Sequence, residues 1–533
     1  MDRTGNTIGK VLIIGAAGLM SVSILCAWES KLFPRTEQGY EYATASDGYR
    51  LPDFSYAGYH GGDKEIPAIE TAESISSSGS DDTAAIQKAV DEMKKPGALL
   101  LRAGTYIVTD EIVLPPGAVL RGEGTNRTFI FVKTTDFRSK AAIVGYHSAF
   151  TKQKRSVWSS SEPSQKSFVD QNIARGASVI PVARLADFPE GSWVVVKNEI
   201  RKSESNPLRE EYNGTSSDGG TLLWPSDWVS FKFMRKVVRH ENGSLVLDHG
   251  IRHLLQTRDF AQVMEAPDMG EEIGVEDLSI GFLKPDDHDT YHSLTSAGEK
   301  SSYHFARAVS FGNVRNGWIV RVASYIPEGG VHLLSCGIGL EHSKWITVKD
   351  CVMQDPVNLG GGANGYGFLI YGADECLVLN STGIDCRHNF MLTIAATGNV
   401  ITGCTSVGSR YGDDSHQGLA CENLIDDIRI TAPSAIGAGF IWGIQNRGKT
   451  SAGAGQCGAD NVFWRVFWDD NRFPLISDQA EVNGSAGYVI GVSKVKENIQ
   501  SKREWREGIG DEANLMPRSL WQEQLKLRKK SAD

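Results

Sequence analysis

The chain has few cysteines and no excess of basic residues, and each absence excludes a class of protein. It carries 8 cysteines in 533 residues, and no two of them have the Cys-x-x-Cys spacing of a zinc module. Lysine and arginine number 55 against 65 aspartates and glutamates, which gives a formal net charge of −10. Nucleic-acid-binding proteins are usually basic, so we predict no nucleic-acid partner. An acidic polymer would need a local cationic cleft.

Glycine is abundant but has no Gly-X-Y period, which excludes a collagen-like rod. The 57 glycines instead indicate a fold with many tight turns. With 41% hydrophobic and 23% charged residues, the chain can bury a sizeable core. Neither wholesale disorder nor a multi-pass membrane protein is expected.

A long apolar run lies at the N-terminus. Arg3 and Lys10 precede a stretch that begins at Val11 and ends at the small residue Ala27. This pattern is typical of a secretory signal, and its length leaves a membrane anchor over residues 8–28 as the alternative. The sequence therefore predicts a secreted or cell-envelope protein.

Short apolar segments recur along most of the chain, separated by glycine and proline. Strands expected at 318, 345, 376, 399 and 427 begin 27, 31, 23 and 28 residues apart. Such spacings are typical of one coil of a parallel β-helix, in which short buried strands stack along a common axis. Residues 81–90 have apolar side chains at helical spacing, so we expect a helix before the first coils.

Composition and strand rhythm divide the chain into six predicted segments. These are a signal peptide or membrane anchor (1–28), a linker (29–50), an N-terminal cap with the first coils (51–134), an inserted β region (135–270), the main coils (271–445) and a C-terminal extension with a terminal helix (446–533).

Three stretches near the start of the coils, Gly79–Gln87, Ala98–Ile107 and Val119–Gly124, carry a familiar pattern. They resemble the entry module of the pectate-lyase superfamily, of the rhamnogalacturonase/epimerase-like kind, in which a helix caps a right-handed parallel β-helix. We therefore expect an all-β fold, a right-handed parallel β-helix (solenoid) with an N-terminal capping helix and an inserted β region. The superfamily includes lyases, hydrolases, epimerases and phage spikes, so the resemblance does not fix the activity.

Polar residues are densest in the late coils. Tyr366, His388 and Tyr411 are 22 and 23 residues apart, which is close to one coil. Residues one coil apart stack on the same face of a β-helix, so we expect these three side chains to line one groove. Arg387 and Arg410 should lie beside them.

This set suits β-elimination of a uronate, in which a base removes the proton next to the sugar carboxylate. Either arginine could hold that carboxylate in two-point geometry. His388 or His416 could be the base, because the pKa of histidine lies near neutrality. Tyr366 or Tyr411 could donate a proton to the leaving oxygen. The predicted catalytic residues are Arg387, His388, His416, Asp413 and Asp414, and the predicted substrate-binding residues are Tyr366, Arg410, Tyr411 and Lys344.

Asp413 and Asp414 support a different chemistry, because glycoside hydrolysis uses two carboxylates. The Gly-His-Gly element of β-helix polygalacturonases does not appear in the chain. The sequence thus favours a polysaccharide lyase that acts on an acidic, uronate-containing polymer. A β-helix hydrolase and a non-catalytic carbohydrate-binding or adhesion module are the alternatives. We expect a monomer, and the sequence leaves open whether Ca²⁺ is required.

Overall fold

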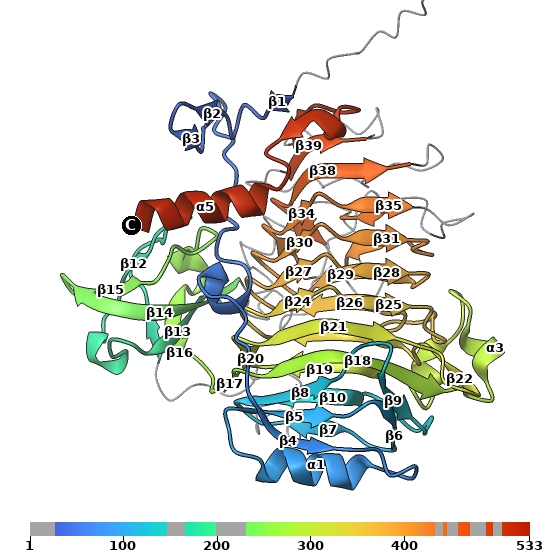
Figure 1. Ribbon diagram of the computed structural model, residues 1–533. Coiled ribbons are helices and arrows are strands. Elements are labelled where there is room, and N and C mark those ends of the chain that lie inside the picture. Colours follow the sequence, from blue (N-terminus) through green and yellow to red (C-terminus); the bar gives the residue numbers. More distant parts are fainter. Residues whose placement is uncertain are drawn as a thin grey trace, which may run out of the picture.

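The computed structural model describes most of the chain. The described residues are 27–146, 166–198, 231–416, 418–431, 437, 441–444, 457–469, 487–493 and 504–532. Strands wind around one axis and stack coil upon coil, so that the chain forms an elongated solenoid (Figure 1). The predicted parallel β-helix is therefore confirmed.

One wall of the solenoid is an eight-stranded sheet in which every pair of neighbours is parallel. Its strands are β7 (Ile112–Leu114), β10 (Ala141–Tyr146), β19 (Arg307–Gly312), β23 (Cys336–Glu341), β26 (Tyr366–Tyr371), β29 (His388–Thr393), β32 (Asp413–Ser415) and β36 (Trp442–Gly443).

The remaining walls are two rows of strands, also parallel along each row, that meet in the long strands β18, β21 and β38. The first row contains β4 (Thr71–Ile75), β5 (Gly97–Leu101), β8 (Ala118–Gly122), β18 (Gly274–Leu283), β21 (Trp318–Ser324), β24 (Thr347–Lys349), β27 (Leu377–Leu379), β30 (Val400–Thr402), β34 (Leu424–Asp426), β38 (Val462–Trp468), β39 (Gly487–Val492) and β40 (Glu504–Glu507). The second row adds β6 (Gly104–Val108), β9 (Thr128–Val132), β25 (Val352–Gln354), β28 (Thr382–Ile384), β31 (Thr405–Val407) and β35 (Arg429–Thr431).

The core consists of like side chains stacked from coil to coil. Val309, Ile338, Phe368 and Phe390 follow one another in register, and each is at most 2% exposed. Burying each such side chain contributes about 1.5–3 kcal/mol. The short apolar strands of the sequence pattern are therefore the inner lining of the solenoid.

The corners between the two rows depend on residues that tolerate a left-handed backbone. Asp350, Asn380 and Asp427 have φ angles of 54°, 50° and 46° and end β24, β27 and β34 at equivalent places in successive coils. Asparagine and aspartate adopt this conformation more readily than other residues with a side chain. The chain can therefore change direction with a single residue at each of these corners.

A helix and a second sheet are attached to the solenoid. Helix α1 (Thr83–Glu92) covers the end of the first coils, and Ile86 and Val90 pack fully buried into the core (Figure 1). The inserted sheet is antiparallel and lies beside the coils. Its strands are β11 (Lys166–Phe168), β12 (Val179–Pro181), β13 (Trp193–Lys197), β14 (Lys232–Glu241), β15 (Ser244–Leu247) and β16 (Gln262–Glu265).

Residues 29–50 are not the predicted linker. Leu32 and Phe33 are fully buried in a cluster that also contains coil residues, and Phe33 stacks on Tyr40 with 5.5 Å between ring centroids. The sequence pattern did not predict their burial, because these few apolar side chains stand among polar neighbours. Their burial ties the segment to the coils.

Strands continue past residue 445, where the sequence pattern loosens, because β38, β39 and β40 extend the first row. Helix α5 (Leu520–Ala532) follows them. The smaller elements include α3 (His288–Tyr291), β1 (Trp28–Glu29) with β41 (Leu515–Met516), β2 (Arg35–Thr36) with β3 (Gly39–Tyr40), β17 (Gly270–Glu271) with β20 (Val314–Arg315), β22 (Gly330–Val331), and β33 (Ala420–Cys421) with β37 (Gly458–Ala459).

Within the described ranges, no helix has the length and apolar character needed to cross a membrane. The predicted signal or anchor lies almost wholly outside the described residues, which begin at 27.

Candidate functional site

The eight-stranded sheet carries an aligned set of three rings on its outward face, here called the aromatic column: Tyr366, His388 and Tyr411. Tyr366 on β26 is in register with His388 on β29, and their ring centroids lie 5.5 Å apart. Tyr411, just before β32, follows with its ring 6.0 Å from that of His388. Tyr366 packs with Leu369 and Met391 in a cluster separate from the core. The predicted alignment is confirmed, while the chemical roles of the three residues stay predictions.

Arg387 lies against the column. Its guanidinium is 5.4 Å from the centre of the Tyr411 ring, and Nη1 donates hydrogen bonds to the carbonyls of Gly361 and Leu359. Its Nε is buried and has no hydrogen-bond partner among the described residues. The guanidinium therefore packs against the column and forms no ion pair among the described residues.

Arg410 lies at the rim and is already paired. Its Nη2 is 3.0 Å from Oδ1 of Asp355, and Nε2 of His292 is 3.3 Å from the same oxygen. The hydrogen bond from His292, together with the charge of Arg410, lowers the pKa of Asp355. A substrate carboxylate would have to compete with Asp355 for Arg410.

Asp414 and His416 form a hydrogen-bonded pair on the same face. Asp414 is in register with the outward residue Met391, and its Oδ2 is 2.9 Å from Nδ1 of His416. A carboxylate can only accept, so Nδ1 carries the proton and the lone pair of the neutral imidazole lies on Nε2. Both residues are close enough to shift the pKa of His388. The pair has the arrangement of an oriented base.

His388 has a different environment. It is 1% exposed, and burial lowers its pKa to about 3 against the opposing effect of Asp414. Its Nδ1 donates to the carbonyl of Gly412 at 2.5 Å. The ring is therefore neutral at ordinary pH and a weak base, which makes His416 the better of the two predicted bases.

Asp413 is not on this face, which corrects its prediction as a catalytic residue. It is fully buried in register with the core residue Trp442, and its Oδ1 accepts the backbone N–H of Phe390 at 3.0 Å. Burial raises its pKa to about 6, more than its hydrogen bonds lower it. Neighbouring residues of a strand point to opposite faces, so Asp413 and Asp414 cannot flank one glycosidic bond.

Lys344 is also misplaced by the prediction, because it occupies a corner of the coil under the inserted sheet. It belongs to a set of buried charges, here called the junction cluster: Arg235, Arg252, Lys344, Asp374 and Glu375. Its Nζ contacts Glu375 and lies 3.3 Å from Oδ2 of Asp374. With every partner inside the protein, Lys344 has no route to a substrate.

The sequence analysis did not predict that Arg307 and Glu341 belong to the outward face of the eight-stranded sheet. Arg307 on β19 is in register with Cys336, which packs against Tyr366, so it precedes the aromatic column in the stack. Its Nη1 lies 3.0 Å from Oε1 of Glu341. The spacings of 29 and 30 residues from 307 to 336 and from 336 to 366 are the signal that could have found it.

Within the described residues, no group of three or more histidines, cysteines, aspartates and glutamates is arranged to hold a metal ion. The question of calcium, left open by the sequence, therefore gains no candidate ligands here.

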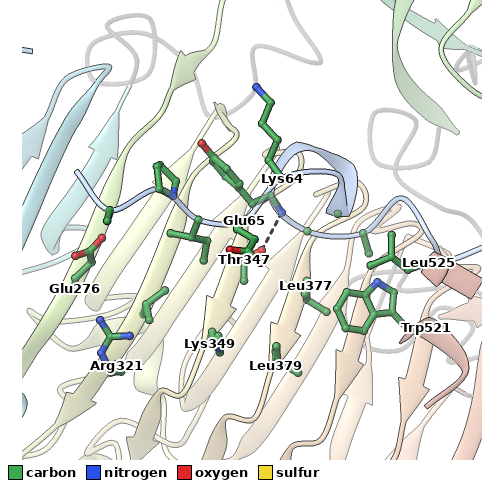
Figure 2. Close-up of a pocket in the computed structure, with 18 of the residues that line it drawn as sticks. Lys64, Glu65, Glu276, Arg321, Thr347, Lys349, Leu377, Leu379, Trp521 and Leu525 are labelled. Atoms are coloured by element: carbon green, nitrogen blue, oxygen red, sulfur yellow. Dashed lines mark hydrogen bonds between the residues drawn. The ribbon is translucent and has the colours of Figure 1, made fainter. Parts of the chain in front are cut away.

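Two cavities lie away from this face. One, of about 750 Å³, runs between the first row of strands and the segment that includes Lys64 and Glu65. Figure 2 shows Lys349 and Leu379 on its floor and Trp521 at the end formed by α5. It offers no paired imidazole and carboxylate, so we place the candidate site on the outward face and not in this cavity. The second cavity is described below.

Residues 77–178 match a family model described as rhamnogalacturonase A/epimerase, pectate lyase-like. The match includes the three stretches on which the resemblance was based. Together with the stacked parallel coils, it makes the chain a pectate-lyase-like parallel β-helix, as predicted. A comparison with curated proteins gave no match.

Several solved structures are similar at low sequence identity. The tailspike protein gp49 of Pseudomonas phage LKA1 is 11% identical with a TM-score of 0.39, and the match covers 77% of this chain and 63% of that one. The chain thus spans less than two thirds of that tailspike. An alginate lyase from Paenibacillus sp. str. FPU-7 is 7% identical, with a TM-score of 0.40 and coverage of 82% and 99%. A polygalacturonase from Erwinia carotovora ssp. carotovora is 9% identical, with a TM-score of 0.32 and coverage of 84% and 97%.

Proposed function

We propose that the protein is a polysaccharide lyase that cleaves an acidic, uronate-containing polymer by β-elimination on the outward face of the eight-stranded sheet. The observation that carries this proposal is the 2.9 Å hydrogen bond between Asp414 and His416 on the face that bears the aromatic column. It supplies an oriented imidazole on the same face as a guanidinium and two phenols, the groups that the reaction needs.

His416 is the base. Its Nε2 takes the proton from C5 of the uronate, and Asp414 holds Nδ1 and stabilises the imidazolium that forms. A general base of this kind accelerates a reaction by about 10²–10⁴-fold. His388, neutral with its proton on Nδ1, presents Nε2 as a hydrogen-bond acceptor.

Arg387 neutralises the substrate carboxylate. The C5 proton is acidic only when the negative charge of the neighbouring carboxylate is compensated, because the electron pair moves toward that group. The guanidinium of Arg387, 5.4 Å from the centre of the Tyr411 ring, supplies the compensating positive charge. Arg410 is the poorer choice, since Asp355 already occupies it.

Tyr411 serves the leaving group. As the C5–H electrons form the C4=C5 double bond, the C4–O bond breaks and its electron pair stays on the oxygen. The phenol of Tyr411 gives that oxygen a proton and regains one from solvent, while His416 releases to solvent the proton that it took from C5. The products are an unsaturated uronate end and a chain with a free hydroxyl, so atoms and charge balance.

Export belongs to the proposal as well, on the strength of the basic start and apolar run over residues 1–28. Mass determination of the N-terminus of protein recovered from the culture medium and from the membrane fraction tests it. A full-length chain found only in the cytosol would contradict it.

The activity is tested by incubating the purified protein with polygalacturonate, alginate and a neutral glucan while ultraviolet absorbance and reducing ends are followed. We expect absorbance to rise with one of the acidic polymers and reducing ends to rise in step. Reducing ends without absorbance would mean hydrolysis, the alternative mechanism. Binding with neither signal would mean a carbohydrate-binding or adhesion module. Adding a chelator to the active reaction decides whether calcium is needed.

A further inference from the structure

A cavity of about 810 Å³ lies where three separate parts of the chain meet. Its walls come from the N-terminal segment between 42 and 56, the inserted sheet at 175–178 and 248–252, and Glu422 and Tyr488 of the coils. The aromatic column and the Asp414–His416 pair are not among its lining residues. Interfaces between folded units are common places for small-molecule sites.

Charged groups of both signs line this cavity. Arg50 is exposed, with its guanidinium 5.5 Å from the centre of the Tyr42 ring, and within the described part of the chain it forms no ion pair. Arg175 is 39% exposed and lies 2.7 Å from Glu422. The cavity therefore offers hydrogen-bond donors at its rim.

Acceptors face these donors from the inserted sheet. Asp248 accepts two backbone N–H groups at Oδ1, at 3.1 and 3.0 Å, while its Oδ2 has no hydrogen-bond partner among the described residues. His249 is 2.7 Å from Glu375 through Nε2, and its Nδ1 lies 3.3 Å from Oδ1 of Asp248, so both ring nitrogens face carboxylates. Unsatisfied buried acceptors are costly and are usually paired in proteins.

The balance of charge defines the class of ligand. An anion would face Asp53, Asp248 and Glu422, and a cation would face Arg50 and Arg175. An apolar ligand would displace the water bound to all of these charged groups without replacing its hydrogen bonds, which is unfavourable. A neutral molecule rich in hydroxyl groups can donate to the carboxylates and accept from the guanidiniums at the same time.

We propose that this cavity binds a short neutral saccharide, at a site separate from the outward face of the eight-stranded sheet. Hydroxyl groups of the sugar donate to Asp248, and its oxygens accept from Arg50. A volume of about 810 Å³ lies within the usual range of small-molecule pockets. The proposal does not depend on the lyase activity.

Isothermal titration calorimetry of the full chain with maltotriose, cellotriose and mannotriose tests the site, and trigalacturonate is the acidic comparison. We expect at least one neutral trisaccharide to bind. Arg50→Ala and Asp248→Asn should each weaken that binding about tenfold or more, because each removes a hydrogen bond to a charged group. Arg50 is exposed, so its variant should fold like the parent protein.

Two control variants outside the cavity test whether the trisaccharide binds in it. Arg35→Ala removes an exposed arginine of the same N-terminal segment that does not line the cavity, and Asp414→Asn alters the other face. Both should bind the trisaccharide as the parent protein does. The proposal is overturned if no neutral trisaccharide binds at millimolar concentration, if only trigalacturonate binds, or if Arg50→Ala and Asp248→Asn bind unchanged.

Discussion

The outward face of the eight-stranded sheet and the junction cluster are both rich in charged side chains, but they hold them differently. In the junction cluster, Glu375 is fully buried among Arg235, Arg252 and Lys344. Burial would raise its pKa, but the surrounding cations hold the pKa well below its usual range. On the outward face, Asp414 is paired with an imidazole, and Arg387 forms no ion pair among the described residues.

This difference separates a structural role from a chemical one. Charges that pair with one another inside the protein fix how the inserted sheet sits on the coils. An imidazole oriented by a carboxylate, on the same face as a guanidinium that is not neutralised by an ion pair among the described residues, can act on a molecule from outside. A dense cluster of charged residues therefore indicates a functional site only if some of its charges are not already paired with one another inside the protein.

The largest expected effect is on turnover, from His416→Ala. Removing the base should lower kcat on the cleaved polymer by about 10²–10⁴-fold, with the free energy of unfolding nearly unchanged. Initial rates of absorbance increase give the value. The control is His240→Ala in the inserted sheet, where the imidazole only bonds to the carbonyl of Phe188. Equal rates for the two variants would remove His416 from the mechanism.

The next effect is on stability, from Glu375→Gln. Losing the central carboxylate leaves buried cations uncompensated, which typically costs about 3–5 kcal/mol. Urea unfolding followed by circular dichroism measures the loss. Glu241→Gln breaks an ion pair with Arg239 that is about half exposed on each side, so it should cost less than about 1 kcal/mol. A similar cost for both variants would show that the junction cluster is not what fixes the inserted sheet.

A pH-dependent effect separates Asp413 from Asp414. Burial raises the pKa of Asp413 to about 6 in the folded protein, above the usual value of 3.8. The folded state therefore binds its proton more tightly, so this contribution to stability is fully present below about pH 4 and is lost as pH rises through about 6. The full change amounts to about 3 kcal/mol.

Asp413→Asn removes that titration. Relative to the parent protein, the variant should gain about 3 kcal/mol in free energy of unfolding between pH 4 and pH 7, measured by urea unfolding at both values. Turnover per folded molecule should fall far less than in His416→Ala, because Asp413 faces the core. A stability difference that is the same at both pH values would contradict the buried position.

Much of the fold could be predicted from the sequence, because short apolar strands at coil spacing, preceded by a capping helix, are compatible with few folds other than a parallel β-helix. The alignment of Tyr366, His388 and Tyr411 follows from the same spacing. Spacing in the sequence assigns a residue to a coil but does not tell whether its side chain points into the core or outward, since a shift of one residue along a strand reverses the face. Asp413 and Lys344 were misjudged for this reason. Leu32 and Phe33 were missed because two apolar residues form no period.

The smallest expected effect is on KM, and it distinguishes two arginines between which the sequence could not choose as the binder of the substrate carboxylate. Arg387 forms no ion pair within the described part of the chain, whereas Arg410 is held by Asp355. Lysine keeps the charge but loses the two-point geometry of the guanidinium, so Arg387→Lys should raise KM by about tenfold. Arg410→Lys should change KM by less than about threefold, because its partner is a rim carboxylate and such exposed pairs contribute little. Steady-state kinetics on the cleaved polymer gives both values. A larger effect from Arg410→Lys would move the carboxylate site to the rim, where a substrate would displace Asp355 from Arg410.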